Sequence, residues 1–373
     1  MNLRTLPKPF FVLAPMDDVT DTVFRQIVAD CAKPDLYVTE FVNVDGLQSP
    51  GREKLLPKLR LGPQEGLARV SHLDEMQGDG EKRSEAYQEY VERVSEPTTQ
   101  QFVRSTNRVS GSAGKQVSAV RKSWPIIAQI WGKDPKNFYE TAKDLVEMGF
   151  DGVDINFGCP EKSVIKNGCC IGMINNRELA GEIITAVREA VGTSLPVSVK
   201  TRLGLGEVDY TWHEFLLKQK LNMLTIHGRT AKHLSKVPAD WQAIEHIRKL
   251  RDQLFPTTLI VGNGDVKNRI QGESLAKKHG LDGIMIGRGI FDDPFLFAKL
   301  SPWAGFTREQ RLELYSKHVK LFAQTWTNNE HKIYTLNKFC KVYINGFDGA
   351  KELREQLMAA GTAEDLLVKL ITD

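Results

Sequence analysis

A cysteine at position 159 stands between a glycine and a proline, in the run Asn156-Phe157-Gly158-Cys159-Pro160 that closes a short apolar segment. A turn of this composition at the end of a strand directs a side chain outward. A thiol with the ordinary pKa of about 8.5 is protonated at neutral pH, so Cys159 could donate a proton as a general acid. It could instead attack as a thiolate, although no base is identifiable nearby in the sequence. Cys169 and Cys170 follow in KNGCCIGM, a small-residue loop to which we assign no role.

Three further polar residues close apolar runs elsewhere in the chain: Lys200 in VSVK, Gln129 in IIAQ and His227 in LTIH. Burying an ammonium group costs several kcal/mol unless it is paired, so Lys200 is rarely structural at such a position. Two roles fit it: a Schiff-base nucleophile, or a cation beside an electron-rich cofactor ring. The Gln129 amide suits hydrogen bonding to a heterocycle. His227 suits a contact to a phosphate or a ring, or a place in the core.

Two glycine turns, GNGD at 262–265 and IGRG at 286–289, follow later apolar runs. Glycine lets the chain approach an anion closely, and free backbone amides bind it. Arg288 would add a charge-assisted contact. Together the two turns predict a phosphate site.

Eight apolar runs carry these residues, and amphipathic stretches separate most of them. The runs are 10–16, 36–41, 125–132, 152–160, 196–204, 222–230, 258–265 and 283–289. Continuous apolar runs fit parallel strands buried on both faces, so the pattern predicts an α/β protein with a (β/α)8 TIM barrel. In that fold the chemistry lies at the carboxyl ends of the strands. Those ends carry Met16, Gln129, Asn156, Cys159, Lys200, Arg202, His227, Arg229, Asn263, Asp265 and Arg288.

Helices are expected between the strands at 20–31, 134–149, 176–192, 240–254, 268–280 and 293–300, the first with Thr20 or Asp21 as its N-cap. From about residue 303 only helical periodicity remains, in 307–326, 337–347 and 350–373. The sequence therefore predicts a barrel over 1–302 and an all-helical C-terminal domain of three or four helices over 303–373.

Residues 66–123 interrupt the barrel pattern with few large apolar residues, and 97–122 carries basic residues but no acid. We interpret the span as a flexible insertion in the loop before the third strand. The alternative is that its basic part attracts RNA phosphates.

Composition narrows the class of protein. The 373 residues carry a net charge of +3, with 41% hydrophobic and 26% charged residues, which is ordinary for a globular protein. No apolar run reaches the roughly 20 residues that span a bilayer, so no membrane partner is expected. The five cysteines form no metal-ligand spacing and no even disulfide set, which favours the reducing cytoplasm and predicts no metal. Nothing indicates an obligate protein partner.

Several motifs in order resemble the tRNA-dihydrouridine synthases. They are APM (14–16), AQIWG (128–132), DINFGCP (154–160), VKTRLG (199–204), HGRT (227–230) with ADW (239–241), GNGD and IGRG. The resemblance runs from about residue 8 to 300, and the helical tail resembles that family's tRNA-binding domain.

The resemblance implies reduction of the C5–C6 double bond of uridines in tRNA, with FMN as cofactor and NADPH or NADH as reductant. It implies that Cys159 donates a proton to C5 while hydride reaches C6, and that Asn156 contacts the uracil. The residues implied to bind FMN are Pro15, Met16, Asp17, Gln129, Lys200, His227, Asn263, Gly264, Asp265, Gly287 and Arg288. Arg202 and Arg229, with Lys232 and His233, are expected near the rim to grip tRNA phosphates, and the uridine must be turned out of the folded RNA to enter the barrel.

Three other functions remain open from the sequence. One is an FMN barrel that acts on a free pyrimidine, as dihydroorotate dehydrogenases do; the helical tail argues against it. The second is a Schiff-base lyase that uses Lys200. The third is an RNA-binding barrel that has lost catalysis.

Overall fold

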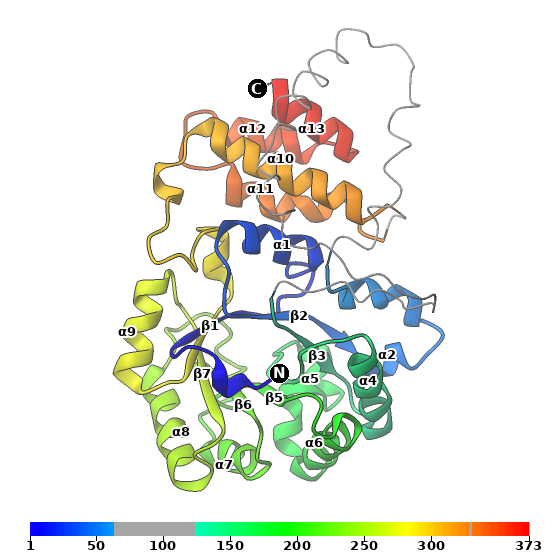
Figure 1. The fold of residues 1–373 in the computed structure, drawn as a ribbon, viewed down its shortest axis with the longest axis vertical. Coiled ribbons are helices and arrows are strands. Elements are labelled where there is room, and N and C mark those ends of the chain that lie inside the picture. Colours follow the sequence, from blue (N-terminus) through cyan, green and yellow to red (C-terminus); the bar gives the residue numbers. More distant parts are fainter. Residues whose placement is uncertain (63–123, 328–329, 373) are drawn as a thin grey trace, which may run out of the picture.

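The computed structural model describes residues 1–62, 124–327 and 330–372, and the predicted insertion at 66–123 lies outside them. Eight parallel strands close into a barrel in chain order. Figure 1 shows the strands in the lower part of the molecule, with helices around them. The strands are β1 (Phe10–Leu13), β2 (Leu36–Asn43), β3 (Ile126–Trp131), β4 (Gly152–Phe157), β5 (Val197–Arg202), β6 (Met223–His227), β7 (Leu259–Asn263) and β8 (Gly283–Ile286). All eight predicted strands are present, and the TIM-barrel prediction is confirmed.

The barrel closes where β1 pairs with β8 in register, Phe10 opposite Gly283. The Phe10 ring occupies the space beside Gly283, since a Cβ atom there would lie 2.8 Å from the ring. β1 also pairs with β2, so neither terminal strand leaves an open edge. Side chains of β1, β4, β7 and β8 are buried on both faces, which explains why these strands are continuous apolar runs.

Helices pack outside the barrel between successive strands. The longer ones are α1 (Thr22–Cys31), α4 (Pro135–Glu147), α6 (Arg177–Val191), α7 (Tyr210–Lys218), α8 (Trp241–Leu254) and α9 (Arg269–His279). Shorter elements are α2 (Val44–Leu47), α5 (Lys162–Lys166), η1 (Leu3–Thr5), η2 (Arg52–Lys54), η3 (Leu56–Leu59), η6 (Cys170–Asn175), η7 (Arg288–Phe291), η8 (Trp303–Gly305) and η9 (Ile333–Leu336). Asp21 caps α1, since its side chain accepts a hydrogen bond from the Phe24 amide.

The helix predicted at 293–300 is wrong. This segment forms a series of turns, in which the Asp293 side chain accepts from the Phe295 amide and the Phe295 carbonyl accepts from Ala298. Asp-Pro begins this stretch as it begins a helix elsewhere, but here the Asp293 carboxylate closes a local turn. Helix α7 was not predicted, although Asp209 caps it through the Trp212 amide.

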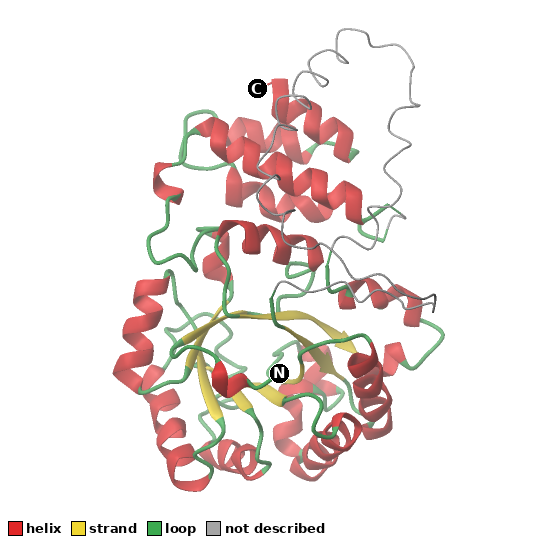
Figure 2. Ribbon diagram, viewed as in Figure 1, coloured by secondary structure: helices red, strands yellow, loops and turns green. Residues whose placement is uncertain are grey.

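Four helices follow the barrel, within the predicted three or four: α10 (Arg308–Thr325), α11 (Asn337–Tyr343), α12 (Ala350–Met358) and α13 (Ala363–Thr372). A capping box between Thr307 and Gln310 starts α10. The four helices gather above α1, apart from the strands of the barrel, as Figure 2 shows. Phe24 of α1 packs on Phe339 of α11 with ring centroids 4.8 Å apart. The domain boundary at residue 302 stays a prediction. None of the helices in the described ranges has the length and apolarity of a membrane span.

Candidate active site at the carboxyl ends of the strands

A cavity of about 650 Å³ opens at the carboxyl ends of β1 and β5–β8. Its volume lies within the range of small-molecule and cofactor pockets. The predicted residues that line it are Pro15, Met16, Lys200, His227, Arg229, Asn263, Gly264, Asp265, Gly287 and Arg288. The structure therefore brings together residues from five separate strand ends.

Lys200, at the end of β5, lines the cavity, and its ammonium group has no hydrogen bond or ion pair to any residue in the described part of the chain. Burial lowers its pKa to about 8, and neighbouring Arg202 lowers it further while Asp154 opposes the shift. A half-buried cation without a protein partner is costly. The position therefore fits an anionic or electron-rich ligand.

His227 is held as a neutral imidazole of defined orientation. Burial lowers its pKa to about 2, and the cations Lys200, Arg202 and Arg229 add to the effect. The Nη1 of Arg229 lies 3.2 Å from Nε2 of His227. A guanidinium can only donate, so Nε2 accepts and Nδ1 carries the proton. His227 can therefore donate one hydrogen bond from Nδ1.

Arg229 is held in place by its contact with His227 and by two further protein contacts. It is 3% exposed, pairs with the Asp265 carboxylate, and donates from Nε to the Val237 carbonyl. Asp265 in turn accepts from the Ala239 amide at 2.9 Å. The predicted role of Arg229 as a grip on tRNA phosphates does not match this buried place, because its donors are already used inside the wall.

The two glycine turns form the far end of the cavity. Gly264 has φ +137°, a conformation that side chains disfavour, and a Cβ atom there would lie 2.6 Å from Cβ of Ala239. Asn263 is fixed by donating from Nδ2 to the Met285 carbonyl at 2.8 Å. Arg288 remains 65% exposed, 3.8 Å from Asp265. An exposed guanidinium beside two glycine turns suits a phosphate group.

Cys159 lies on the opposite side, beyond β4. Its backbone N–H and that of Gly158 both donate to Oδ1 of Asn156, at 2.9 and 3.0 Å. Arg202 donates from Nε to the Gly158 carbonyl at 2.9 Å. The turn that carries the thiol is therefore held by side chains from β4 and β5.

Arg202 does not reach the rim as predicted. It is 8% exposed, and its Nη1 lies 3.3 Å from the carbonyls of Thr230 and Leu234. Lys232 and His233 are exposed, so of the four predicted rim cations only these two face solvent. An arginine at a strand end can satisfy loop carbonyls as readily as a ligand, and sequence does not distinguish the two.

The thiol of Cys159 does not have the ordinary pKa assumed from the sequence, and that assumption is wrong. A hydrogen bond from the thiol of Cys170 lowers the pKa of Cys159 to about 6; burial opposes this effect, and the Glu161 backbone and Arg202 assist it. The same contact raises the pKa of Cys170, which is 1% exposed at the start of η6. Cys170 is therefore a site residue that the sequence reasoning missed; the only signal for it was a second cysteine in the loop that follows Cys159.

Gln129 and Asn156 lie beneath the cavity surface. Gln129 is fully buried, and Asn156 is 7% exposed. Nδ2 of Asn156 donates to Oε1 of Gln129 at 3.0 Å. Neither residue is among those that line the cavity, and neither is Cys159.

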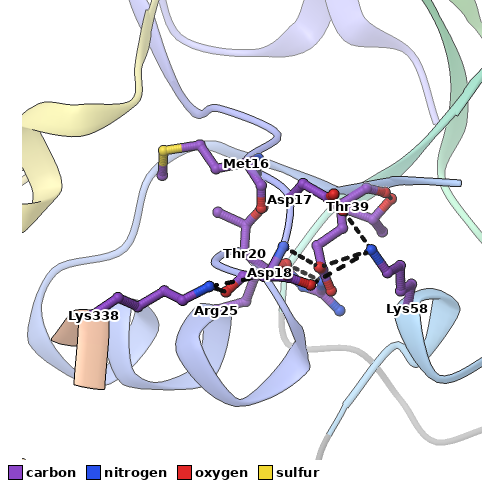
Figure 3. A network of polar contacts seen from close by, with 9 residues as sticks. Met16, Asp17, Asp18, Thr20, Arg25, Thr39, Lys58 and Lys338 are labelled. Atoms are coloured by element: carbon purple, nitrogen blue, oxygen red, sulfur yellow. Dashed lines mark hydrogen bonds and ion pairs between the residues drawn. The ribbon is translucent and has the colours of Figure 1, made fainter. Parts of the chain in front are cut away.

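Asp17 also points away from the cavity. Figure 3 shows Lys58 reaching toward Asp17 and Asp18, while the Met16 side chain extends to the other side. Lys58 pairs with Asp17, and its Nζ lies 3.8 Å from Asp18 and 3.6 Å from Glu40. Glu40 is buried, and burial raises its pKa to about 7. This acidic group already holds a cation, the Lys58 ammonium.

Comparison with known proteins identifies the chain. The family described as Dihydrouridine synthase (Dus) matches residues 84–371. The "Probable tRNA-dihydrouridine synthase" of Staphylococcus aureus (strain COL) is 38% identical over 355 residues, covering 95% of this chain and 89% of that protein. The "Probable tRNA-dihydrouridine synthase 2" of Bacillus subtilis (strain 168) is 38% identical over 366 residues, covering 97% and 93%.

The class defined by fold and site is a flavin-dependent TIM-barrel oxidoreductase. The chain belongs to the dihydrouridine synthase family, whose members act on uridines of tRNA. Among solved structures, histamine dehydrogenase from Rhizobium sp. 4-9 matches with a TM-score of 0.50 and 13% identity over 83% of this chain and 48% of that chain, a likeness of fold alone.

Proposed function

We propose that this tRNA-dihydrouridine synthase holds FMN in the cavity at β1 and β5–β8 and transfers a proton from Cys159 to C5 of the target uridine. The observation that carries the proposal is the Lys200 ammonium, which lies in the cavity wall and has no hydrogen-bond or ion-pair partner among the described residues. It lies between glycine turns suited to a phosphate and the turn that presents a thiol.

The cavity residues fit the parts of FMN. Gly264, Gly287 and Arg288 would take the phosphate, because glycine turns and an exposed guanidinium favour an anion. Lys200 would lie beside the flavin ring, where its charge favours an electron-rich edge. His227 would donate from Nδ1. Reduced by NADPH or NADH, the bound flavin would supply the hydride that reaches C6 of uracil.

Pro15, Met16, Asn263 and Asp265 would complete the site from the cavity wall, where the structure has them. Asp17 and Gln129, implied by the family resemblance to bind FMN, would act from behind the wall in the conformation described. Asp17 then holds Lys58 and the loop after β1, and Gln129 supports Asn156. Arg202 and Arg229 would likewise shape the wall rather than grip tRNA.

Proton transfer requires Cys159 in its thiol form. The Cys170 hydrogen bond favours the thiolate. Negative charge brought into the site raises the pKa of Cys159, because a thiolate beside an anion is disfavoured. Filling the site therefore restores the proton that Cys159 gives to C5. Asn156, which already orders the Cys159 turn, has one N–H left to contact the uracil.

The substrate is tRNA, and the target uridine would turn out of the stack to reach the barrel. We infer that the helices α10–α13 and the exposed loop with Lys232 and His233 contact the RNA backbone. The five cysteines are all free, which agrees with a reducing cytoplasm. No obligate protein partner is expected from the sequence.

The test is to incubate the purified chain and Cys159→Ala with NADPH and tRNA that lacks dihydrouridine, and to quantify dihydrouridine by mass spectrometry. FMN extracted from the protein, product from the wild type and a large loss in the variant are expected. A flavin-loaded protein that reduces orotate but not tRNA would replace this function with chemistry on a free pyrimidine. A flavin-free protein trapped on Lys200 by borohydride and a carbonyl compound would point to a lyase.

A further inference from the structure

A buried carboxylate on β4 has no place in the chemistry described so far. Asp154 is 1% exposed and faces the interior of the barrel between Gln129 of β3 and Ser198 of β5. Its Oδ2 accepts from Nε2 of Gln129 at 2.7 Å, and its Oδ1 accepts from Oγ of Ser198 at 2.5 Å. Burial raises its pKa to about 6, and both hydrogen bonds oppose the rise. Burying a carboxylate at this depth has a substantial free-energy cost, which favours a role for Asp154 that an apolar residue could not fill.

What Asp154 does is fix the direction of an amide. An ionised carboxylate only accepts hydrogen bonds, so Gln129 must turn its NH2 group toward Asp154 and its carbonyl oxygen away. That oxygen then accepts from Nδ2 of Asn156 at 3.0 Å. The orientation of Asn156 follows in the same way, because its NH2 group is drawn to Gln129 and its oxygen is left facing the next turn.

The last hydrogen bonds of this series hold the turn that carries the Cys159 thiol. Oδ1 of Asn156 accepts from the backbone N–H groups of Gly158 and Cys159 at 3.0 and 2.9 Å. If the amides were reversed, the NH2 group of Asn156 would face these two N–H groups, donor against donor, and the turn would lose both bonds. The Asp154 carboxylate, at the start of this series of hydrogen bonds, therefore determines the geometry of the Cys159 turn at its end.

We propose that Asp154 is a positioning residue for proton transfer: through the oriented amides of Gln129 and Asn156 it fixes the turn that presents the Cys159 thiol. The inference rests on the proposed role of Cys159, and it assigns to Asp154 no contact with substrate or cofactor. The β3–β4 register, Gln129 opposite Asp154, places the first two members side by side. The rigid strands thus carry the alignment to a loop residue.

Two substitutions separate the hydrogen-bond direction from the charge. Asp154→Leu keeps the approximate shape and removes the acceptor. Asp154→Asn removes the charge but keeps an oxygen for Gln129, since its NH2 group can face Ser198, whose hydroxyl also accepts. Ser198→Ala is the matched control, because it removes a neighbour of Asp154 and leaves the amide chain intact. Asp154→Val replaces the leucine variant if that variant does not fold.

Two readouts are needed. One is kcat for dihydrouridine formation. The other is the pH profile of Cys159 alkylation by iodoacetamide, followed by mass spectrometry of the peptide that carries Cys159, which does not depend on turnover. For Asp154→Leu we expect kcat to fall about 10²-fold, as for a misplaced reacting group, and the alkylation midpoint to move upward toward that of an ordinary thiol. Asp154→Asn and Ser198→Ala should each stay within about 3-fold of wild type in kcat, small against that loss, with the alkylation midpoint unchanged.

Two results overturn the inference. Wild-type kcat and an unchanged alkylation profile in Asp154→Leu, or in Asp154→Val, would show that the amide direction does not matter. A loss in Asp154→Asn as large as in Asp154→Leu would assign the effect to charge. Failure of the proposed function is separate: it would show as full activity in Cys159→Ala, whatever the alkylation profiles are.

Discussion

The two sides of the barrel mouth satisfy their polar groups in opposite ways. On the β5–β8 side, Lys200 and Arg288 present charge to a cavity, and Arg288 is largely exposed. On the β3–β4 side, Asp154, Gln129 and Asn156 are buried and hydrogen-bonded to one another. Under the proposed function, a ligand would supply the partner for the first side, whereas the polar groups of the second side are satisfied by one another.

The difference follows from what each side has to do. Binding an anionic cofactor requires cations whose desolvation is offset only by the ligand. Delivering a proton requires a thiol held in a fixed place before the substrate enters. Under the proposed function, the first side would set the affinity for the cofactor, and the second would set the rate of the chemical step.

The largest effect is expected from removing the Cys159 thiol, which tests whether the two sides of the barrel mouth have separate roles. Cys159→Ala should lower kcat by about 10²- to 10⁴-fold, the usual contribution of a general acid, with flavin content unchanged. Single-turnover formation of dihydrouridine, measured by mass spectrometry, checks the rate, and the absorbance of bound flavin checks the content. Cys169→Ala, in the neighbouring loop, is the control and should behave as wild type. Equal loss of flavin and activity in Cys159→Ala would mean that the two sides are not distinct.

Removing the ammonium on the other side should act on affinity first. Lys200→Met should weaken flavin binding about 10- to 100-fold, as loss of a charge partner in a partly buried site does. Because the pKa of Lys200 is lowered to about 8, its positive charge is lost as pH rises through that value. Flavin affinity of the wild type should therefore fall above pH 8, and that fall should be smaller in Lys200→Met. Fluorescence titration with FMN at pH 7 and pH 9 measures both.

The outcome that contradicts this prediction is a Lys200→Met protein with wild-type flavin affinity at both pH values. Lys267→Met is a useful comparison, since Lys267 also lines the cavity but lies beyond the β7 turn.

A smaller effect is expected from the contact between the Cys159 and Cys170 thiols. In Cys170→Ala the hydrogen bond to Cys159 is lost, so the pKa of Cys159 should rise from about 6 toward the ordinary thiol value. With a rise of about 1 to 2 pKa units, the thiolate fraction at pH 7 falls about 2- to 10-fold, and alkylation at pH 7 slows accordingly. Rapid-quench alkylation between pH 5 and pH 9 gives the midpoint. A midpoint unchanged by the substitution would remove Cys170 from the site.

The smallest effect is expected at Arg229, which lies beside His227 on the cavity side. Arg229→Met removes the donor at Nε2 of His227, so the imidazole is no longer restricted to the form protonated at Nδ1. Flavin affinity should fall only about 3- to 10-fold, the value of one hydrogen bond. NMR of ¹⁵N-labelled histidine distinguishes the two tautomers. Finding His227 protonated at Nε2 in the wild type would contradict the assignment.

Sequence predicted the fold well, because its signals are local. Uninterrupted apolar runs identify strands buried on both faces, and capping residues such as Asp21 and Asp134 mark helix starts. The same local signal failed at 293–300, where Asp293 caps a turn rather than a helix. It also missed α7, whose nine residues give too short a periodic pattern.

The candidate site was predicted less completely, for a different reason. Position at a strand end predicted correctly that Lys200, His227 and Arg288 gather around one cavity. It could not predict which polar side chains are captured by neighbours, as Asp17 is by Lys58 and Arg202 is by the Gly158 carbonyl. Those partners come from distant parts of the chain, so only the folded structure defines them. The lowered pKa of Cys159 likewise depends on a contact, that with Cys170, which only the folded structure shows.

The packing of Phe24 has a consequence for how the chain unfolds. Phe24 belongs to a barrel helix, yet its ring lies against His318 and Phe339 of the helices that follow the barrel. A single buried apolar cluster runs without interruption from the strands through α1 to Leu366 and Leu370 of α13. Segments that share a core tend to lose it together, so we expect the barrel and the helices α10–α13 to unfold cooperatively. The predicted boundary at residue 302 therefore does not coincide with a break in the buried apolar cluster.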